Sequence, residues 1–254
     1  MKKILSIFIV FTLLGCATNT VNVNNNKNRL AEAYFKMGIA YLGTEDDYLA
    51  VKEFEKAIDL NPNDDRFYYA LSTFYIKKNR LKDAKTNIEK ALKLNPKESE
   101  YLNTYASILA SEGNLYEAVS VWKKVLDDPS YAFADRVNYN VGLALYNLGK
   151  YDEAIEYLTV AVKINPKVIA PTVLLYQTYL KAGRIKDAED TLKNSLTINP
   201  DSLELKYEMG KFYYENGKYS KSAIYFSEII EQNPDSKLSV DAKIYLQKMG
   251  IYNE

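Results

Sequence analysis

A period of 34 residues governs most of this chain. The same Asn-Pro pair closes five similar segments, AIDLNPND, ALKLNPKE, AVKINPKV, SLTINPDS and IIEQNPDS. The prolines stand at positions 62, 96, 166, 200 and 234, so that successive spacings are 34, 70, 34 and 34 residues. A fixed period of this length is typical of repeat architectures, in which each repeat is one supersecondary unit. The period therefore limits the possible folds more than any other feature of the sequence.

Upstream of each proline, the same classes of residue recur at the same places. Small residues at the eighth, twentieth and twenty-seventh places allow two helix axes to approach closely, and large apolar residues between them fill the layer. The proline ends the second helix, because it has no N–H and clashes with the preceding turn. In the first unit the pattern consists of Tyr34, Met37, Gly38, Tyr41, Ala50, Phe54, Ala57 and Pro62, and in the second of Tyr68, Leu71, Ser72, Tyr75, Ala84, Ile88, Ala91 and Pro96.

This pattern resembles the tetratricopeptide repeat, in which each 34 residues form two antiparallel helices. The resemblance implies an all-α, right-handed superhelical solenoid of six repeats with a C-terminal capping helix. Tyr176 and Val125 occupy places where a small residue is usual, and we expect locally wider helix spacing there rather than loss of a unit. Within a repeat domain spanning 29–254, we place the units at about 31–64, 65–98, 99–134, 135–168, 169–202 and 203–236 and the cap at 237–250.

The N-terminal segment MKKILSIFIVFTLLGC has the pattern of a lipoprotein signal peptide. Lys2 and Lys3 precede a twelve-residue apolar run, Ile4–Gly15. That run is too short to span a bilayer, which takes roughly 20 residues as a helix. Its end, Leu-Leu-Gly-Cys, resembles the bacterial lipobox. The resemblance implies that residues 1–15 are cleaved and that Cys16, the only cysteine, carries a diacyl or triacyl anchor.

The segment after Cys16 predicts a tether. Residues 16–28 are polar and rich in asparagine, without a hydrophobic period, which is typical of a disordered linker. Ala17 follows the cysteine, and by resemblance to enterobacterial lipoproteins this favours the outer over the inner membrane. We therefore expect a chain that is anchored by lipid to the outer membrane and faces the periplasm.

Composition excludes several kinds of chemistry. The chain has no histidine, which rules out zinc sites and acid–base catalysis that depend on imidazole, and its one thiol is assigned to the anchor. No phosphate-binding glycine motif is present, and the acidic run GTEDDY fits a solvated interhelical turn. Basic and acidic residues number 33 each and are interspersed, which disfavours a nucleic-acid partner. We expect no catalytic residue, metal, cofactor or small-molecule substrate.

Protein binding is the function that the repeat architecture favours. In tetratricopeptide repeats the first helix of each unit lines a concave groove, with its second, fifth, ninth and twelfth residues facing inward. Tyrosine presents a large apolar body and a hydroxyl group, and it is frequent at interfaces. An amphipathic helix or an extended apolar peptide would fit such a groove. The predicted groove residues are Phe35, Ile39, Leu42, Tyr69, Ile76, Tyr139, Tyr146, Tyr207 and Tyr214. The Lys and Asn clamp of the repeats that bind C-terminal carboxylates is absent.

The repeat slips by two residues at DPSYAFADRVNYNVG, residues 128–142. A neutral loop insertion explains the slip, and Tyr131 and Phe133 are available to pack over the junction. The lipobox, the six units and this junction together also resemble the type IV pilus pilotin lipoproteins of the PilF/PilW type. The matching junction residues are Pro129, Tyr131, Arg136, Asn140 and Gly142.

That resemblance implies a scaffold that binds the pilus secretin and promotes its localisation and assembly in the outer membrane. A different class of scaffold is the alternative: an outer-membrane adaptor that docks periplasmic enzymes of the cell wall or of polysaccharides. An enzyme would need carboxylates that converge in the groove, and the sequence shows no such cluster.

Overall fold

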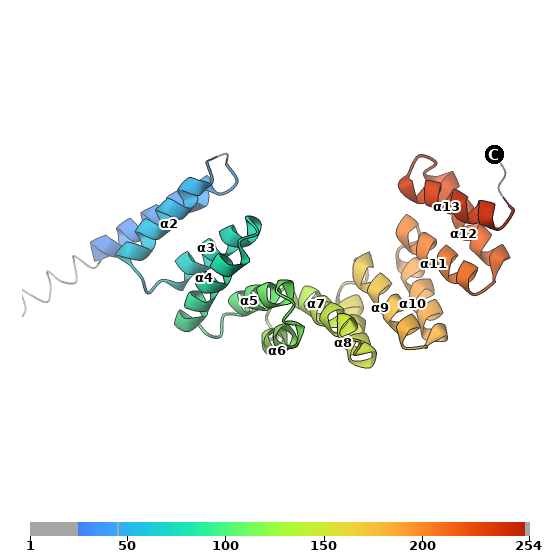
Figure 1. Ribbon diagram of the computed structural model, residues 1–254, viewed down its shortest axis with the longest axis horizontal. Coiled ribbons are helices and arrows are strands. Elements are labelled where there is room, and N and C mark those ends of the chain that lie inside the picture. The colour runs from blue at the N-terminus through green and yellow to red at the C-terminus, as the bar shows by residue number, and fades with distance from the viewer. Residues whose placement is uncertain (1–24, 45, 252–254) are drawn as a thin grey trace, which may run out of the picture. The chain divides into compact units, whose positions relative to one another are not determined.

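The structure is a computed structural model that describes residues 25–44 and 46–251. Every regular element in this part of the chain is helical. The helices are joined into successive pairs by tight turns (Figure 1). By internal contacts, the chain divides between Asn114 and Leu115 into two compact units.

The first unit begins with a helix over residues 25–41, and four further helices follow it. They are α2 (Tyr48–Leu60), α3 (Asp65–Lys77), α4 (Leu81–Leu94) and α5 (Ser99–Ser111). Helix α3 packs on both α2 and α4, and α4 packs on α5. The second helix of one repeat thus covers the first helix of the next.

The second unit continues the same alternation. It contains α6 (Leu115–Leu126), α7 (Ala134–Asn147), α8 (Tyr151–Ile164), α9 (Ile169–Lys181), α10 (Ile185–Ile198), α11 (Leu203–Glu215), α12 (Tyr219–Gln232) and α13 (Lys237–Lys248). Each helix packs on the next along the chain, and α13 closes the series against α12 and α11. The prediction of an all-α repeat solenoid that ends in a capping helix is confirmed.

The start of the repeat domain differs from the prediction. Residues 25–28 are helical, whereas the sequence predicts a tether up to residue 28 and a repeat domain from residue 29. A short polar run before an amphipathic segment can extend its helix, because the added turn continues hydrogen bonds that have already been nucleated. Cys16, the signal segment 1–15 and residues 16–24 lie outside the described residues.

Small residues at the eighth place of a repeat receive a large side chain from the second helix. A Cβ atom added to Gly142 would lie 2.5 Å from Cγ of Leu158, and one added to Gly210 would lie 2.7 Å from Cε1 of Phe226. Both large side chains are fully buried. The glycines therefore let the paired helices approach, as predicted, because a large side chain of the second helix fills the space where a Cβ atom would lie.

Asn-Pro pairs follow five of the second helices, and in two of them the asparagine bonds to the start of the partner helix. After α4, the N–H of Asn95 donates to the carbonyl of Ala91 at 2.8 Å, and its side-chain amide donates to Asp65 at 3.2 Å. In the fourth repeat, Asn165 makes the equivalent bond to Asp135, also at 3.2 Å. The asparagine thus bonds both to the last turn of its own helix and to the first turn of the partner helix, while the proline prevents the helix from continuing.

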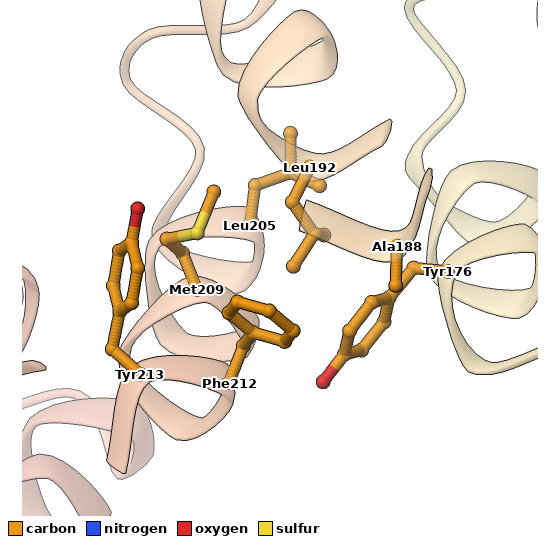
Figure 2. Close-up of a cluster of buried hydrophobic side chains, with 7 residues drawn as sticks. All are labelled: Tyr176, Ala188, Leu192, Leu205, Met209, Phe212 and Tyr213. Atoms are coloured by element: carbon orange, nitrogen blue, oxygen red, sulfur yellow. The ribbon is translucent and has the colours of Figure 1, made fainter. Parts of the chain in front are cut away.

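The two irregular places do not cost the protein a repeat. Tyr176 is buried in α9, and its ring meets that of Phe212 in α11 with centroids 6.2 Å apart (Figure 2). The ring completes a buried cluster that α9, α10 and α11 share. Val125 in α6 is buried too. Besides Tyr176 and Phe212, the buried members of the cluster shared by α9, α10 and α11 are Ala188, Leu192, Leu205, Met209 and Tyr213.

The slip in the repeat forms a turn between α6 and α7. Helix α6 has 12 residues, whereas α4, α8, α10 and α12 have 14 each. Asp128 accepts a hydrogen bond from the N–H of Ser130 at 3.0 Å. The rings of Tyr131 and Phe133 meet edge to face at 5.9 Å, and the guanidinium of Arg136 lies 4.7 Å from the Phe133 ring. Phe133 stays 44% exposed, so the two aromatic residues pack on each other without burying it.

Candidate protein-binding surface

Two parallel rows of side chains form the predicted groove in the first unit. Phe35, Ile39 and Leu42 are spaced four and three residues apart, and the same spacing recurs on α3 at positions 69, 73 and 76. Residues with this spacing lie on one face of a helix. Contacts join the two helices at both ends of these rows: Arg66 bonds to Glu32 at one end, and Lys78 pairs with Asp47 at the other. We name the six residues Phe35, Ile39, Leu42, Tyr69, Thr73 and Ile76 the N-terminal face.

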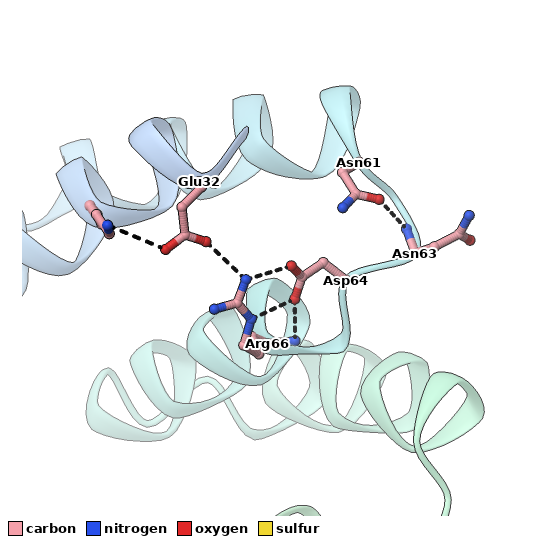
Figure 3. A network of polar contacts seen from close by, with 6 residues as sticks. Glu32, Asn61, Asn63, Asp64 and Arg66 are labelled. Atoms are coloured by element: carbon pink, nitrogen blue, oxygen red, sulfur yellow. Dashed lines mark hydrogen bonds and ion pairs between the residues drawn. The ribbon is translucent and has the colours of Figure 1, made fainter. Parts of the chain in front are cut away.

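At one end of this face, Arg66 links the first helix to α3. Its guanidinium donates to Glu32 at 2.8 Å and to the two carboxylate oxygens of Asp64 at 2.7 and 2.9 Å (Figure 3). It also lies 5.4 Å from the ring centroid of Phe35. The hydrogen bond to Asp64 is the largest cause that raises the pKa of Arg66 above its usual value; burial opposes it, and the hydrogen bond to Glu32 adds to the rise. The cation is thus held in place beside Phe35.

At the other end, an open depression of about 290 Å³ separates the two rows. Leu42 and Thr73 line it together with Asp47 and Lys77. Lys78 forms an ion pair with Asp47 at 2.7 Å and so fastens the turn after the first helix to the end of α3. The N-terminal face therefore has a cationic clamp at one end and a small apolar hollow at the other.

Exposure divides the predicted residues of this face into two kinds. Ile39 is 45% exposed and Ile76 is 37% exposed, which makes both available to a partner. Phe35 is half-buried, because its ring packs on Phe54 and Phe67 with centroids 5.7 and 5.0 Å away. Leu42 is half-buried in the same cluster as Phe54. Phe35 therefore belongs as much to the core as to the surface.

Tyr69 is also tied into the core. Its ring lies 4.7 Å from that of Tyr101, and its hydroxyl donates to Glu100 at 3.2 Å. Burial, followed by the charge of Glu100, raises the pKa of Tyr69 to about 12. The hydroxyl is therefore neutral at physiological pH. Its bond to α5 fixes the orientation of the ring on the N-terminal face.

The predicted groove tyrosines of the second unit are all half-buried. Tyr139 and Tyr146 lie on α7, and the ring of Tyr146 meets that of Tyr151 at 5.7 Å. The helix that follows also carries an exposed apolar position, Val160. On α11, Tyr207 and Tyr214 both pack against Tyr245 of the capping helix.

Tyr245 of α13 packs against the two α11 tyrosines. Its ring lies 6.1 Å from that of Tyr207, 5.0 Å from that of Tyr214 and 4.8 Å from that of Phe226. Burial raises the pKa of Tyr207 to about 12. The last pair of predicted groove residues is thus shared between the surface and the packing of the cap.

Sequence reasoning did not identify Arg66 or Tyr245 as parts of these surfaces. For Arg66, a signal was present: the second place of the first three repeats carries Glu32, Arg66 and Glu100, which alternate in charge. Opposite charges one period apart are brought together when repeats stack. For Tyr245 no such signal exists, because its partners depend on how the cap packs.

Neither metal coordination nor a membrane span is found in the part of the chain that the structure describes. No group of three or more acidic, histidine or cysteine residues there could hold a metal ion. No helix there has the length and apolar character needed to cross a bilayer. What the described surfaces offer is contact area, through apolar and aromatic side chains.

Family comparisons agree with this architecture. Tetratricopeptide-repeat models match residues 31–64, 49–108 and 180–242, and a model of anaphase-promoting complex, cyclosome, subunit 3 matches residues 127–195. The described helix pairs and these matches define a scaffold of tetratricopeptide repeats. The chain belongs to the tetratricopeptide-repeat family.

Individual relatives come from several kinds of organism. The type IV pilus assembly protein PilF of Pseudomonas aeruginosa is 24% identical over 157 residues, which cover 60% of this chain and 62% of PilF. Superkiller protein 3 of Schizosaccharomyces pombe is 24% identical over 230 residues, 87% of this chain and 16% of the relative. The chain spans between 16% and 62% of the length of the first curated relatives that it matches.

Solved structures show the same fold. PilW, described as a widely conserved type IV pilus biogenesis factor, superposes with a TM-score of 0.66 at 20% identity and covers 87% of this chain and 99% of its own. A solved structure of Pseudomonas aeruginosa PilF superposes with a TM-score of 0.65 at 18% identity and covers 89% of this chain and 98% of its own. At these identities, the likeness establishes the fold.

Proposed function

We propose that this protein is a non-catalytic scaffold for type IV pilus biogenesis. The observation that carries the proposal is the likeness to both PilF and PilW, which extends over nearly the full length of their solved structures. The lipobox-like segment ending in Cys16 supports a lipid anchor in the outer membrane. In this proposal, the protein binds a subunit of the pilus secretin and promotes its localisation and assembly there.

The N-terminal face is the part of the scaffold that we assign to the secretin. Ile39 and Ile76 offer exposed aliphatic contacts, while the half-buried rings of Phe35 and Tyr69 are held rigidly by their neighbours. Rigid aromatic anchors with exposed apolar neighbours favour binding, because little side-chain entropy is lost. An apolar segment of the partner, helical or extended, would lie between the clamp at Arg66 and the hollow at Leu42.

The test uses the lipidated protein in its own membrane. Outer membranes are solubilised gently, the protein is captured through a C-terminal tag, and the proteins that come with it are identified by mass spectrometry. We expect a secretin among them, and we expect its recovery to fall at least tenfold with Ile39→Gln/Ile76→Gln. A control variant, Ile164→Gln/Ile198→Gln, changes two isoleucines on α8 and α10 that are somewhat more exposed than Ile39 and Ile76, and it should leave recovery unchanged.

Other outcomes reject parts of the proposal. If both double variants recover the secretin as well as the unaltered protein does, the N-terminal face is not its site. If enzymes of the cell wall or of polysaccharides are recovered in place of a secretin, the protein is an adaptor of the alternative class. If mass spectrometry of the protein isolated from its own membrane finds no acyl chain on Cys16, the lipid anchor is rejected.

A further inference from the structure

The first helix exposes an apolar stripe, and three of its four places are buried in nearly every later repeat. Leu30 is 47% exposed, Met37 is 45% exposed, and Ala33 and Ala40 are exposed as well. Their spacing of three, four and three residues places them in one stripe along the helix. We name this stripe the end face. It lies on the same helix as Phe35 and Ile39 but at a different angular position.

Comparison between repeats shows why this face is open. The places of Ala33, Met37 and Ala40 are the third, seventh and tenth of a repeat. In later repeats, second helices such as α2 and α4 pack on the following first helix and cover those places. Among the described residues, no helix precedes the first one. A terminal repeat normally carries a polar outer face, so an apolar end face calls for another covering partner. The equivalent buried residues include Phe67, Leu71, Phe74, Val137, Val141, Ala144, Leu205, Met209 and Phe212.

Cations border the end face. Arg29 and Lys36 are seven residues apart and flank the stripe on one side, and Lys27 lies on its other side near the start of the helix. Arg29 has no ion pair among the described residues, and Lys36 has only a 3.7 Å contact to Glu32 with 74% of its side chain exposed. Exposed contacts of that kind contribute little. Both cations also line an open depression of about 600 Å³, so they are accessible from solvent.

The one nearby acid on this side of the helix does not offset these charges. Glu32 shares the cation Arg66 with Asp64, so this group has a net charge of −1, whereas Lys27, Arg29 and Lys36 together contribute +3. The end face is therefore an apolar stripe with a net positive border. Two copies that met through this face would bring like charges together, which disfavours a dimer. An apolar stripe with a basic border is the pattern of a helix that lies in the interface of an anionic membrane.

Chain length places a membrane within reach of the face. The described part of the helix starts at residue 25, nine residues after Cys16. Nine residues span at most about 30 Å when fully extended. A lipid anchor at Cys16 would keep the first helix close to the bilayer surface. Anionic headgroups attract each nearby Lys or Arg with a free energy of about 1 kcal/mol.

We propose that the end face, Leu30, Ala33, Met37 and Ala40 with its border of Lys27, Arg29 and Lys36, rests on the anionic surface of the membrane. This contact would orient the first repeat relative to the bilayer and leave the N-terminal face open to a protein partner. The inference uses the predicted anchor only to explain proximity. The end face itself can be tested without lipidation and without any pilus protein.

The experiment uses the mature chain, residues 16–254, carrying Cys16→Ser so that no lipid is attached. Its binding is measured by co-flotation with vesicles of phosphatidylethanolamine and phosphatidylglycerol, and with vesicles of phosphatidylcholine as the neutral comparison. We expect binding to the anionic vesicles that weakens as salt is added. Arg29→Gln/Lys36→Gln should reduce the partition coefficient roughly 25-fold, about fivefold for each charge removed.

Three further variants distinguish the contribution of the apolar stripe from that of its basic border. Leu30→Gln/Met37→Gln should also abolish most of the binding, and circular dichroism should show a folded chain, because both side chains are exposed. The matched controls, Ile164→Gln/Ile198→Gln and Lys52→Gln/Lys82→Gln, remove exposed apolar and basic residues from other helices and should bind as the unaltered chain does.

Several results would overturn the proposal. One is the absence of binding to anionic vesicles, and another is equal binding by the end-face and control variants. A dimer in sedimentation equilibrium that Leu30→Gln/Met37→Gln dissolves would assign the face to a second copy instead. Loss of secretin capture in that variant, without vesicle binding by the unaltered chain, would assign it to a protein. Failure of secretin capture alone would reject the proposed function and leave the membrane contact standing.

Discussion

Arg66 donates a hydrogen bond to Glu32 at 2.8 Å, and the two residues are 34 positions apart, one full repeat period. They occupy the same place in consecutive repeats. Stacking of equivalent helices brings equivalent places together, so that a periodic sequence with alternating charge at one place makes an ion pair between neighbouring repeats. Asp64 completes the arrangement by holding the same guanidinium at the start of α3.

We predict that Arg66→Gln lowers the free energy of unfolding by about 1 kcal/mol. Arg66 loses bonds to two carboxylates, but its side chain is half exposed, which limits the effect. Urea unfolding measures the change, and added salt should reduce the difference between the variant and the unaltered protein. Arg80→Gln is the control, because its single bond to Asp83 lies at the surface and should be worth only a few tenths of a kcal/mol. Equal losses in the two variants would contradict a special role for Arg66.

We predict that Phe35→Ala destabilises the protein whereas Ile39→Ala does not. Phe35 packs on two buried rings, so its truncation should cost about 2–3 kcal/mol. Ile39 is exposed, and its truncation should change stability by no more than about 0.5 kcal/mol. Thermal unfolding of the two variants distinguishes the cases. The result decides which variants can report on binding, because a destabilised first repeat would lose a partner for reasons unrelated to contact.

We predict that Gly142→Ala costs about 1–3 kcal/mol of stability. The added methyl group would lie 2.5 Å from the Leu158 side chain, which is fully buried and has little room to move. Adding Leu158→Ala to this variant tests the cause. If the clash is responsible, the double variant should lose less than the sum of the two single losses, as a double-mutant cycle in denaturant would show. If the losses of the two single variants simply add in the double variant, a clash with Leu158 is not the cause of the loss in Gly142→Ala.

We predict that stability falls between pH 10 and pH 12 and that Tyr69→Phe makes the fall shallower. The pKa of Tyr69 is about 12 in the folded protein, above the ordinary value of 10. The unfolded chain therefore loses this proton at lower pH, so that the stabilisation is complete below pH 10 and disappears as the pH rises through 12. Denaturant unfolding at several alkaline pH values measures the slope. The same slope in both proteins would show that Tyr69 does not contribute to it.

Much of the fold could be predicted from the sequence because the signals for it are local. The Asn-Pro pairs, the small residue at the eighth place and the apolar places around it fix where helices begin, pair and end, and α13 was expected as the cap. Residues 25–28 are helical although their composition predicts a tether, because an asparagine-rich composition describes a preference that a neighbouring helix can override.

Only the tertiary structure decided which of the predicted groove residues face solvent. Periodicity places Phe35 and Ile39 on one side of a helix, but it does not say that the rings of Phe54 and Phe67 cover the first and leave the second exposed. The apolar end face at Met37 is hidden in the sequence for the same reason. Its residues match the core pattern of the repeat, and only the absence of a preceding helix among the described residues leaves them exposed. The sequence determines the chemistry of each side chain, whereas its exposure depends on which helices of neighbouring repeats pack against it.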